Sequence, residues 1–209
     1  MMDGLPGAGK STLAENLVDR LCAAGRRADN FGEEQLFTRP IFAEVAHGFR
    51  TKQFATGPMF ETAYRRYLAE WADGWPVLDW SAAGMTGDLP WAMRDRAVFV
   101  GHLRRVAELA EPRQIVLLNL CVDPRTATER AAAQRGVKWL RQYDALAGND
   151  GITGDDPVGR ITAWAERRQG AAEAERGAAR EAGWTIVDLD ASVSPVEVCA
   201  AAYRTVTAS

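Results

Sequence analysis

The sequence predicts an α/β fold in which a mostly parallel sheet is covered by helices on both faces. Short apolar runs alternate with longer segments of helical periodicity along most of the 209 residues, which is the pattern of strands joined by crossover helices. A glycine-rich loop near the start leads directly into one of these helices. Because no Gly/Ser/Pro-rich linker divides the chain, we expect a single domain over residues 1–209.

Four segments contain the strand candidates after the first helix. The run 114–122 is rich in Ile, Val and Leu, which suits a strand buried on both faces. The runs 76–80 and 184–190 are shorter candidates, and 26–34 is expected to hold a short strand and a turn.

Helical periodicity fills the segments between these candidates. The first helix follows the glycine-rich loop and ends near Gly25, and the last begins at Ser194, where Pro195 and Glu197 supply a first-turn proline and a capping acid. Between them, helical patterns occupy 35–72, with breaks at Pro40 and 55–58, then 91–111, 123–136 and 161–182. The Gly/Asp-rich segment 147–159 is predicted to be a mobile loop.

Composition narrows the classes of function. A formal net charge of -3 gives no general electrostatic reason to expect a nucleic-acid partner. The three cysteines form no CxxC pair, and each lies in an apolar run, which predicts buried thiols and no disulfide framework. No apolar stretch approaches the roughly 18 residues of a membrane span. We therefore expect a cytoplasmic protein without a membrane partner.

The glycine-rich loop has the pattern G-x-x-x-x-G-K-[ST], formed here by Gly4, Gly9, Lys10 and Ser11. Glycines allow backbone N–H groups to converge on phosphate oxygens, and the following helix adds the positive end of its dipole. Lys10 is predicted to reach the β- and γ-phosphates and Ser11 to bind Mg²⁺. The complete predicted nucleotide-binding set is Gly4, Gly7, Ala8, Gly9, Lys10, Ser11 and Thr12. ATP is preferred over GTP because no N-K-x-D motif is present.

Only three residues, 1–3, precede this loop, although a central strand commonly has about five or six. Two interpretations remain open. Met1 and Met2 form a short strand that later strands and the first helix support, or the natural chain continues upstream with more apolar, β-prone residues.

The loop "GLPGAGKST" and the segment "DPRTATERAAAQRG" after a buried strand resemble the P-loop small-molecule kinases of the nucleoside-monophosphate-kinase-like group. The resemblance implies a three-layer P-loop kinase fold with a lid, in which 35–75 would form a helical acceptor-binding region and 130–160 the lid. Arg130 and Arg135 would then stabilise the charge of the migrating phosphoryl group as members of this lid.

The stretch "FGEEQ" is similar to the acidic turn of chloramphenicol phosphotransferase and of adenylylsulfate kinases. Glu34 falls at the matching position and is the first candidate for orienting an acceptor hydroxyl or serving as general base. Glu33 is the second candidate. The alternative is that both glutamates are solvated residues of a turn.

Asp79 ends the apolar run "PVLD" and can approach Mg²⁺ or its bound water from the carboxyl edge of a parallel sheet. Its alternative role is to cap the turn "SAAG" that follows. Together these residues predict a Mg²⁺-dependent ATP phosphotransferase that acts on a small-molecule hydroxyl. A nucleotide kinase with a phosphate acceptor and a non-catalytic nucleotide-binding module are the alternatives.

Overall fold

The computed structural model describes residues 1–51, 56–87 and 89–208. Within them, five strands all pair in parallel. The strands are β1 (Met2–Asp3), β2 (Ala28–Phe31), β3 (Trp75–Leu78), β4 (Val116–Cys121) and β5 (Thr185–Asp190). The strands β2, β4 and β5 lie within their predicted candidates, β3 begins one residue before the candidate 76–80, and β1 lies in the three residues before the glycine-rich loop.

The strands form two ladders that share one backbone hydrogen bond. The order is β1-β4-β5 in one ladder and β2-β3 in the other. The Met2 N–H donates to the Trp80 carbonyl at 3.4 Å, so β1 lies beside the end of β3. The resulting succession is β2, β3, β1, β4, β5, with the shortest strand in the middle.

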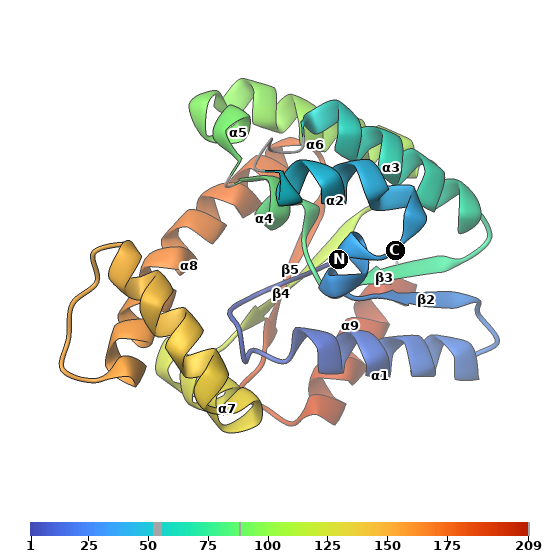
Figure 1. The fold of residues 1–209 in the computed structure, drawn as a ribbon. Coiled ribbons are helices and arrows are strands. Elements are labelled where there is room, and N and C mark those ends of the chain that lie inside the picture. The colour runs from blue at the N-terminus through green and yellow to red at the C-terminus, as the bar shows by residue number, and fades with distance from the viewer. Residues whose placement is uncertain (52–55, 88, 209) are drawn as a thin grey trace.

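Helices cover both faces of these strands, as Figure 1 shows. One face is covered by α1 (Lys10–Ala23) and α9 (Pro195–Thr207), and the other by α3 (Gly57–Glu70), α6 (Arg96–Ala110) and α8 (Pro157–Glu181). The remaining helices are α2 (Ala43–Arg50), α4 (Ala82–Gly87), α5 (Pro90–Arg94) and α7 (Pro124–Asn149), with short 3-10 turns at Glu33–Phe37 and Pro40–Phe42. The predicted α/β fold with a covered parallel sheet is thus confirmed.

Several local predictions need correction. The expected helix 91–111 is broken at Asp95, whose carboxylate caps α6 by accepting from the Ala97 and Val98 amides. The expected turn "SAAG" is the start of α4. The helix expected over 123–136 continues to Asn149 through a kink at Gly136, where φ is 72°.

Local signals explain other boundaries. Ser194 and Glu197 form the predicted capping box at the start of α9. The segment predicted as a mobile loop is shorter than expected, because α7 ends at Asn149 and α8 begins at Pro157. The predicted break at 55–58 falls partly outside the described residues.

Two of the three thiol predictions were wrong. Cys22 and Cys121 are exposed and Cys199 is buried, and all three are free. Cys22 lies on α1 next to the buried Leu21 but one position further round the helix, which turns it toward solvent. Among the described residues, no helix combines the length and apolar composition needed to cross a membrane.

Candidate phosphate-transfer site

The glycine-rich loop adopts the backbone that its glycines permit. Gly4, Gly7 and Gly9 have φ values of 134°, 85° and 97°, which are strained for residues with a Cβ. A Cβ on Gly7 would also collide with the backbone carbonyl of Ala127 at the start of α7. Gly7 therefore sets both the curvature of the loop and its close packing on α7.

The loop ends at the N-terminus of α1, which has no side-chain cap because Gly9 occupies the capping position. The first N–H groups of a helix lack partners within the helix and carry its partial positive charge. Ala8 is buried, whereas Ser11 and Thr12 are exposed on the first turn. This end of α1 can therefore receive an anion.

Lys10 folds over the loop and caps its carbonyls. Its Nζ donates to the Gly4 oxygen at 2.7 Å and to the Leu5 oxygen at 3.2 Å. Burial lowers the pKa of Lys10, and the carboxylates of Glu33, Asp3 and Asp79 oppose that shift. The ammonium group is thus held at the concave side of the loop among acidic neighbours.

Ser11 and Asp79, the two predicted metal ligands, lie in contact. The Ser11 hydroxyl donates to Asp79 Oδ2 at 2.9 Å, and the Glu33 N–H donates to Asp79 Oδ1 at 2.7 Å. Asp79 is 7% exposed. A hydroxyl and a carboxylate in contact suit Mg²⁺, which takes one or two protein oxygens and completes its shell with water and phosphate oxygens. The described residues contain no group of three or more His, Cys, Asp or Glu side chains placed to hold a metal ion.

Asp3 links the start of the loop to α8. Its Oδ1 accepts from the Gly4 N–H at 2.8 Å, and its Oδ2 accepts from Arg176 Nη1 at 2.7 Å. Arg176 is 8% exposed and also pairs with Glu173 at 3.0 Å. This buried ion pair fixes α8 against the strand that carries the phosphate loop.

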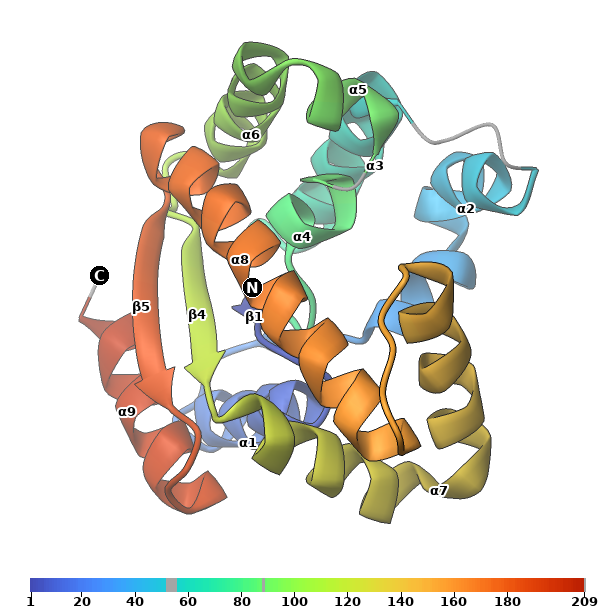
Figure 2. The same ribbon diagram turned by 90° about the vertical axis from the view of Figure 1, so that its left-hand side faces the viewer.

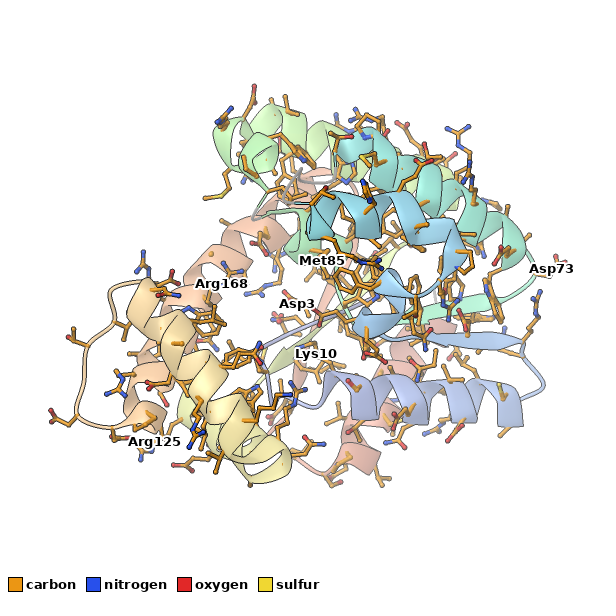
Figure 3. The ribbon with its side chains drawn as sticks, viewed as in Figure 1. Asp3, Lys10, Asp73, Met85, Arg125 and Arg168 are labelled. Atoms are coloured by element: carbon orange, nitrogen blue, oxygen red, sulfur yellow. The ribbon has the colours of Figure 1, made fainter. Side chains whose placement is uncertain are left out.

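The phosphate loop opens onto a cavity of about 1010 Å³. Figure 3 shows Asp3, Lys10, Met85 and Arg168 around the same opening, contributed by β1, α1, α4 and α8. The lining also includes Glu33, Phe49, Trp80, Ser81, Asp123, Gln169, Glu175 and Asp190. Charged and aromatic side chains from distant parts of the chain therefore meet at the carboxyl ends of the strands, where α/β folds place their ligands.

The two glutamates of "FGEEQ" differ in their position. Glu33 lines the cavity and contributes to the electrostatic environment of Lys10. The Glu34 carboxylate instead folds back over Gly32, since a Cβ on that glycine would lie 2.7 Å from Glu34 Oε1. Of the two candidates, Glu33 thus lines the cavity, whereas Glu34, which the sequence ranks first, is not among its lining residues.

The two predicted lid arginines lie in different surroundings. Arg130 Nη1 donates to the Ala191 carbonyl at 2.9 Å, beyond the end of β5. Arg135 lies close enough to Lys10 to lower the pKa of that lysine, although burial is the largest cause of the shift. Arg135 is thus the member of the pair that the structure brings near the phosphate loop.

The sequence analysis did not identify the contribution of α8. Arg168, Ala172, Glu175 and Arg176 all line the cavity and recur at helical spacing, so they form one face of this helix. Figure 2 shows α8 running between α6 and α7 across the molecule. The available signal was a stripe of charged residues within an Ala/Gly-rich segment, a pattern that is also typical of an exposed helix.

Comparison with known proteins gives little further guidance. No protein-family model matches this sequence, and no curated protein sequence matches it. Among solved structures, a deoxyadenosine kinase from M. mycoides with bound dATP is similar to this chain. The match spans 99% of this chain and 97% of the kinase chain, at 14% sequence identity and a TM-score of 0.43. A similarity of this degree carries no conclusion about the family or the substrate of the chain. The site itself offers a loop lysine that lines the cavity, the uncapped N-terminus of α1, and a hydroxyl–carboxylate pair held by the backbone of the lining residue Glu33. This set is suited to binding phosphates together with Mg²⁺.

Proposed function

We propose that the chain is a Mg²⁺-dependent ATP phosphotransferase that acts on the hydroxyl of a small molecule. One observation carries this proposal. The Lys10 ammonium and Glu33 line one cavity, and the Glu33 N–H donates to Asp79, which also accepts from the Ser11 hydroxyl, so nucleotide, metal and acceptor groups could meet there. Transfer of a phosphoryl group depends mainly on such positioning and on electrostatic stabilisation.

The nucleotide phosphates would occupy the concave side of the loop. Backbone N–H groups of the loop and of the first turn of α1 would donate to the phosphate oxygens. The Lys10 ammonium would exchange the Gly4 and Leu5 carbonyls, which it contacts at 2.7 and 3.2 Å, for β- and γ-phosphate oxygens. This exchange keeps its positive charge at the place where negative charge moves during transfer.

The Ser11 hydroxyl and the Asp79 carboxylate would hold Mg²⁺, Asp79 either directly or through bound water. When bound, the metal ion neutralises phosphate charge and aligns the transferred group. The Glu33 N–H holds Asp79 Oδ1 at 2.7 Å, which fixes the orientation of this carboxylate.

Glu33 is the proposed acceptor-side acid, with Glu34 as the comparison residue. It follows β2, lines the cavity and lies on the same side of the loop as Lys10. A carboxylate in this place can accept the proton of an acceptor hydroxyl as that oxygen attacks. Arg135 is proposed to stabilise the charge of the transferred group, because it is the lid arginine that lies near Lys10. Arg130 instead donates to the Ala191 carbonyl after β5.

The acceptor would occupy the part of the cavity between α4 and α8. Its lining there combines the apolar side chains of Phe49, Trp80 and Met85 with the polar side chains of Gln169 and Glu175. Apolar walls with a few polar groups are typical of small-molecule sites, whose volumes are about 300–1,000 Å³. The acceptor is therefore proposed to be a compact molecule with apolar surface as well as a reactive hydroxyl.

A phosphate acceptor is the second candidate, because Arg168 also lines this part of the cavity. Arginine binds phosphate oxygens through two parallel hydrogen bonds. A nucleoside monophosphate would place its phosphate near α8. Its phosphate oxygen could attack without the help of a general base.

The test is a screen for ADP release from ATP and Mg²⁺ with separate panels of hydroxyl acceptors and nucleoside monophosphates. Turnover that depends on a hydroxyl acceptor and is lost in Ser11→Ala supports the proposal. Turnover with monophosphates alone supports the second candidate. Tight ATP binding without acceptor-dependent turnover in either panel would instead indicate a nucleotide-binding module.

A further inference from the structure

An arginine that does not line the cavity holds the acidic 3-10 turn Glu33–Phe37. Arg39 follows this turn, and its side chain reaches back both to the turn and to β2. Its Nε donates to Gln35 Oε1 at 2.8 Å, and Nη2 donates to the same oxygen. Its Nη1 and Nη2 also donate to the two carboxylate oxygens of Asp29, at 2.7 and 3.1 Å. We call the side chains of Asp29, Arg39 and Gln35 the turn clamp.

Neighbouring side chains keep the guanidinium group of Arg39 in place. The Tyr67 hydroxyl of α3 donates to Asp29 Oδ2 at 2.8 Å. The Arg39 Cζ atom lies 4.3 Å from the centre of the Phe31 ring, over which the guanidinium group stacks. A guanidinium that pairs with a carboxylate through two hydrogen bonds has a defined direction as well as a charge. The turn clamp therefore has a rigid base on β2 and α3, and its contact with the turn is Gln35.

The rotation of the turn decides which glutamate meets the cavity. Successive residues of a 3-10 helix are about 120° apart, so the first three side chains of the turn leave it in three directions. Glu33 lines the cavity, and the Glu34 carboxylate folds back over Gly32. Gln35 points to Arg39. Fixing the direction of Gln35 therefore fixes the directions of both glutamates.

Two directional contacts set this rotation. The Glu33 N–H donates to Asp79 Oδ1 at 2.7 Å at the first residue of the turn, and Gln35 accepts from Arg39 at the third. Leu36 of the same turn is buried in the core, but apolar contacts are not directional and hold the turn without fixing its rotation. Of the two directional contacts, the one at Gln35 can be removed without changing a proposed metal ligand.

We propose that Arg39, acting through Gln35, is a positioning residue that turns Glu33 toward the acceptor and keeps Glu34 away from it. The role toward an acceptor rests on the proposed function, whereas the orientation of the turn does not depend on catalysis. A turn released from the clamp would rotate, bring Glu34 nearer to the cavity and withdraw the Glu33 N–H from Asp79.

The test uses Gln35→Met, which removes the oxygen that accepts from Arg39 but leaves the pair between Arg39 and Asp29 intact. Gln35→Glu keeps an accepting oxygen at this position and should preserve the clamp. The matched control is Arg50→Met, because the exposed Arg50 Nη2 donates to the Phe37 carbonyl at the far end of the same turn at 2.8 Å. This control removes a contact of the turn that lies outside the clamp.

Amide hydrogen exchange followed by NMR reports the orientation of the turn without ATP or acceptor. The Glu33 amide should exchange at least about 10-fold faster in Gln35→Met than in the unaltered chain. The Asp79 amide, which donates to the Phe31 carbonyl at 3.2 Å, should change by less than about 2-fold, because it reports the pairing of β2 with β3. Unchanged exchange at Glu33 in Gln35→Met would overturn the proposal. A rise of equal size in Gln35→Glu or in Arg50→Met would overturn it as well.

Turnover with an acceptor gives the second readout. In Gln35→Met, kcat should fall by about 10-fold or more, while the Kd for Mg²⁺-free ATP stays unchanged. Adding Glu33→Gln to this variant should cost less than it costs the unaltered chain, and adding Glu34→Gln should cost more. Additive effects of Gln35→Met and Glu33→Gln would overturn the positioning role. An unaltered chain without acceptor-dependent turnover would overturn the proposed phosphotransfer, whereas the exchange of the Glu33 amide would still decide whether the clamp orients the turn.

Discussion

The free energy of unfolding should fall as the pH decreases from 8 to 5, because the Met1 ammonium lies inside the protein. Burial lowers the pKa of this amino group from 8.0 to about 5. Between these values the unfolded chain binds a proton that the folded chain does not, so stability rises with pH. Three pKa units at about 1.36 kcal/mol each amount to about 4 kcal/mol in full, of which about 3 kcal/mol falls between pH 5 and pH 8 because the amine is half titrated at each end of that range. This is a large fraction of a typical stability of about 5–15 kcal/mol.

The comparison variant is the same chain with an acetylated amino terminus. Residues 1–21 can be synthesised with a free or an acetylated terminus and ligated to the remainder through the natural Cys22, so that no other residue changes. Other groups titrate equally in both chains. They include His102, whose pKa burial lowers while its hydrogen bond to Glu61 opposes the shift. The difference between the two chains therefore isolates the terminal amine.

The assay is urea unfolding of both chains at pH 5, 6, 7 and 8. Between pH 8 and pH 5, the urea concentration at the midpoint of unfolding should fall by about 1–2 M more in the free-amine chain than in the acetylated chain. This range assumes that the free energy of unfolding changes by about 2–3 kcal/mol per M urea. The acetylated chain should lack this additional loss. Parallel pH profiles would refute the reasoning, because they would show that the amine reaches solvent instead of donating to the Val116 carbonyl inside the fold.

Three substitution tests address the site. Lys10→Ala should abolish phosphoryl transfer while leaving the melting temperature within a few degrees, since the lysine serves phosphates and not the core; near-normal turnover in a steady-state assay would contradict its role. Glu33→Gln should lower kcat by about 10²–10⁴ with little change in ATP affinity, whereas Glu34→Gln should have a small effect; the opposite ranking would restore the preference predicted from the sequence. Arg176→Ala should destabilise the fold by about 3 kcal/mol, because it leaves a buried carboxylate unpaired. The matched Arg125→Ala, which removes an exposed i,i+4 pair, should cost about 0.5 kcal/mol or less. Similar losses in urea titrations of these two variants would show that the pair at the phosphate loop behaves like a surface pair.

Strands and most helices were predictable because their signals are local. The run 114–122 is rich in Ile, Val and Leu, which suit a buried strand, and β4 lies inside it. Helix breaks were less predictable, because they depend on single side chains. Asp95 interrupts a continuous helical pattern only because its carboxylate accepts from two amides at the start of α6.

The site was predictable where one short segment contains the chemistry. The spacing of glycines, Lys10 and Ser11 in the loop 4–11 predicts phosphate and metal roles that stay predictions, and Asp79 became a candidate because it follows a strand, after which the structure places it in contact with Ser11. The choice between Glu33 and Glu34 was not predictable, since adjacent residues of a turn differ only in the direction that tertiary packing gives them. The wall contributed by α8 was also missed, because residues more than 150 positions from the loop meet it only through the fold.

The contact between Asp3 and Arg176 ties the start of the phosphate loop to α8. The Asp3 carboxylate accepts from the amide of Gly4, the first loop glycine, and pairs with Arg176 on α8. Arg176 belongs to the same helical face as Arg168, which lines the acceptor side of the cavity. A shift of α8 toward a bound acceptor must therefore either move the start of the phosphate loop or break a buried ion pair. Because breaking such a pair costs about 3–5 kcal/mol, the loop and the α8 wall should move together. Under the proposed function, occupation of the acceptor side would therefore be coupled to the position of the phosphates.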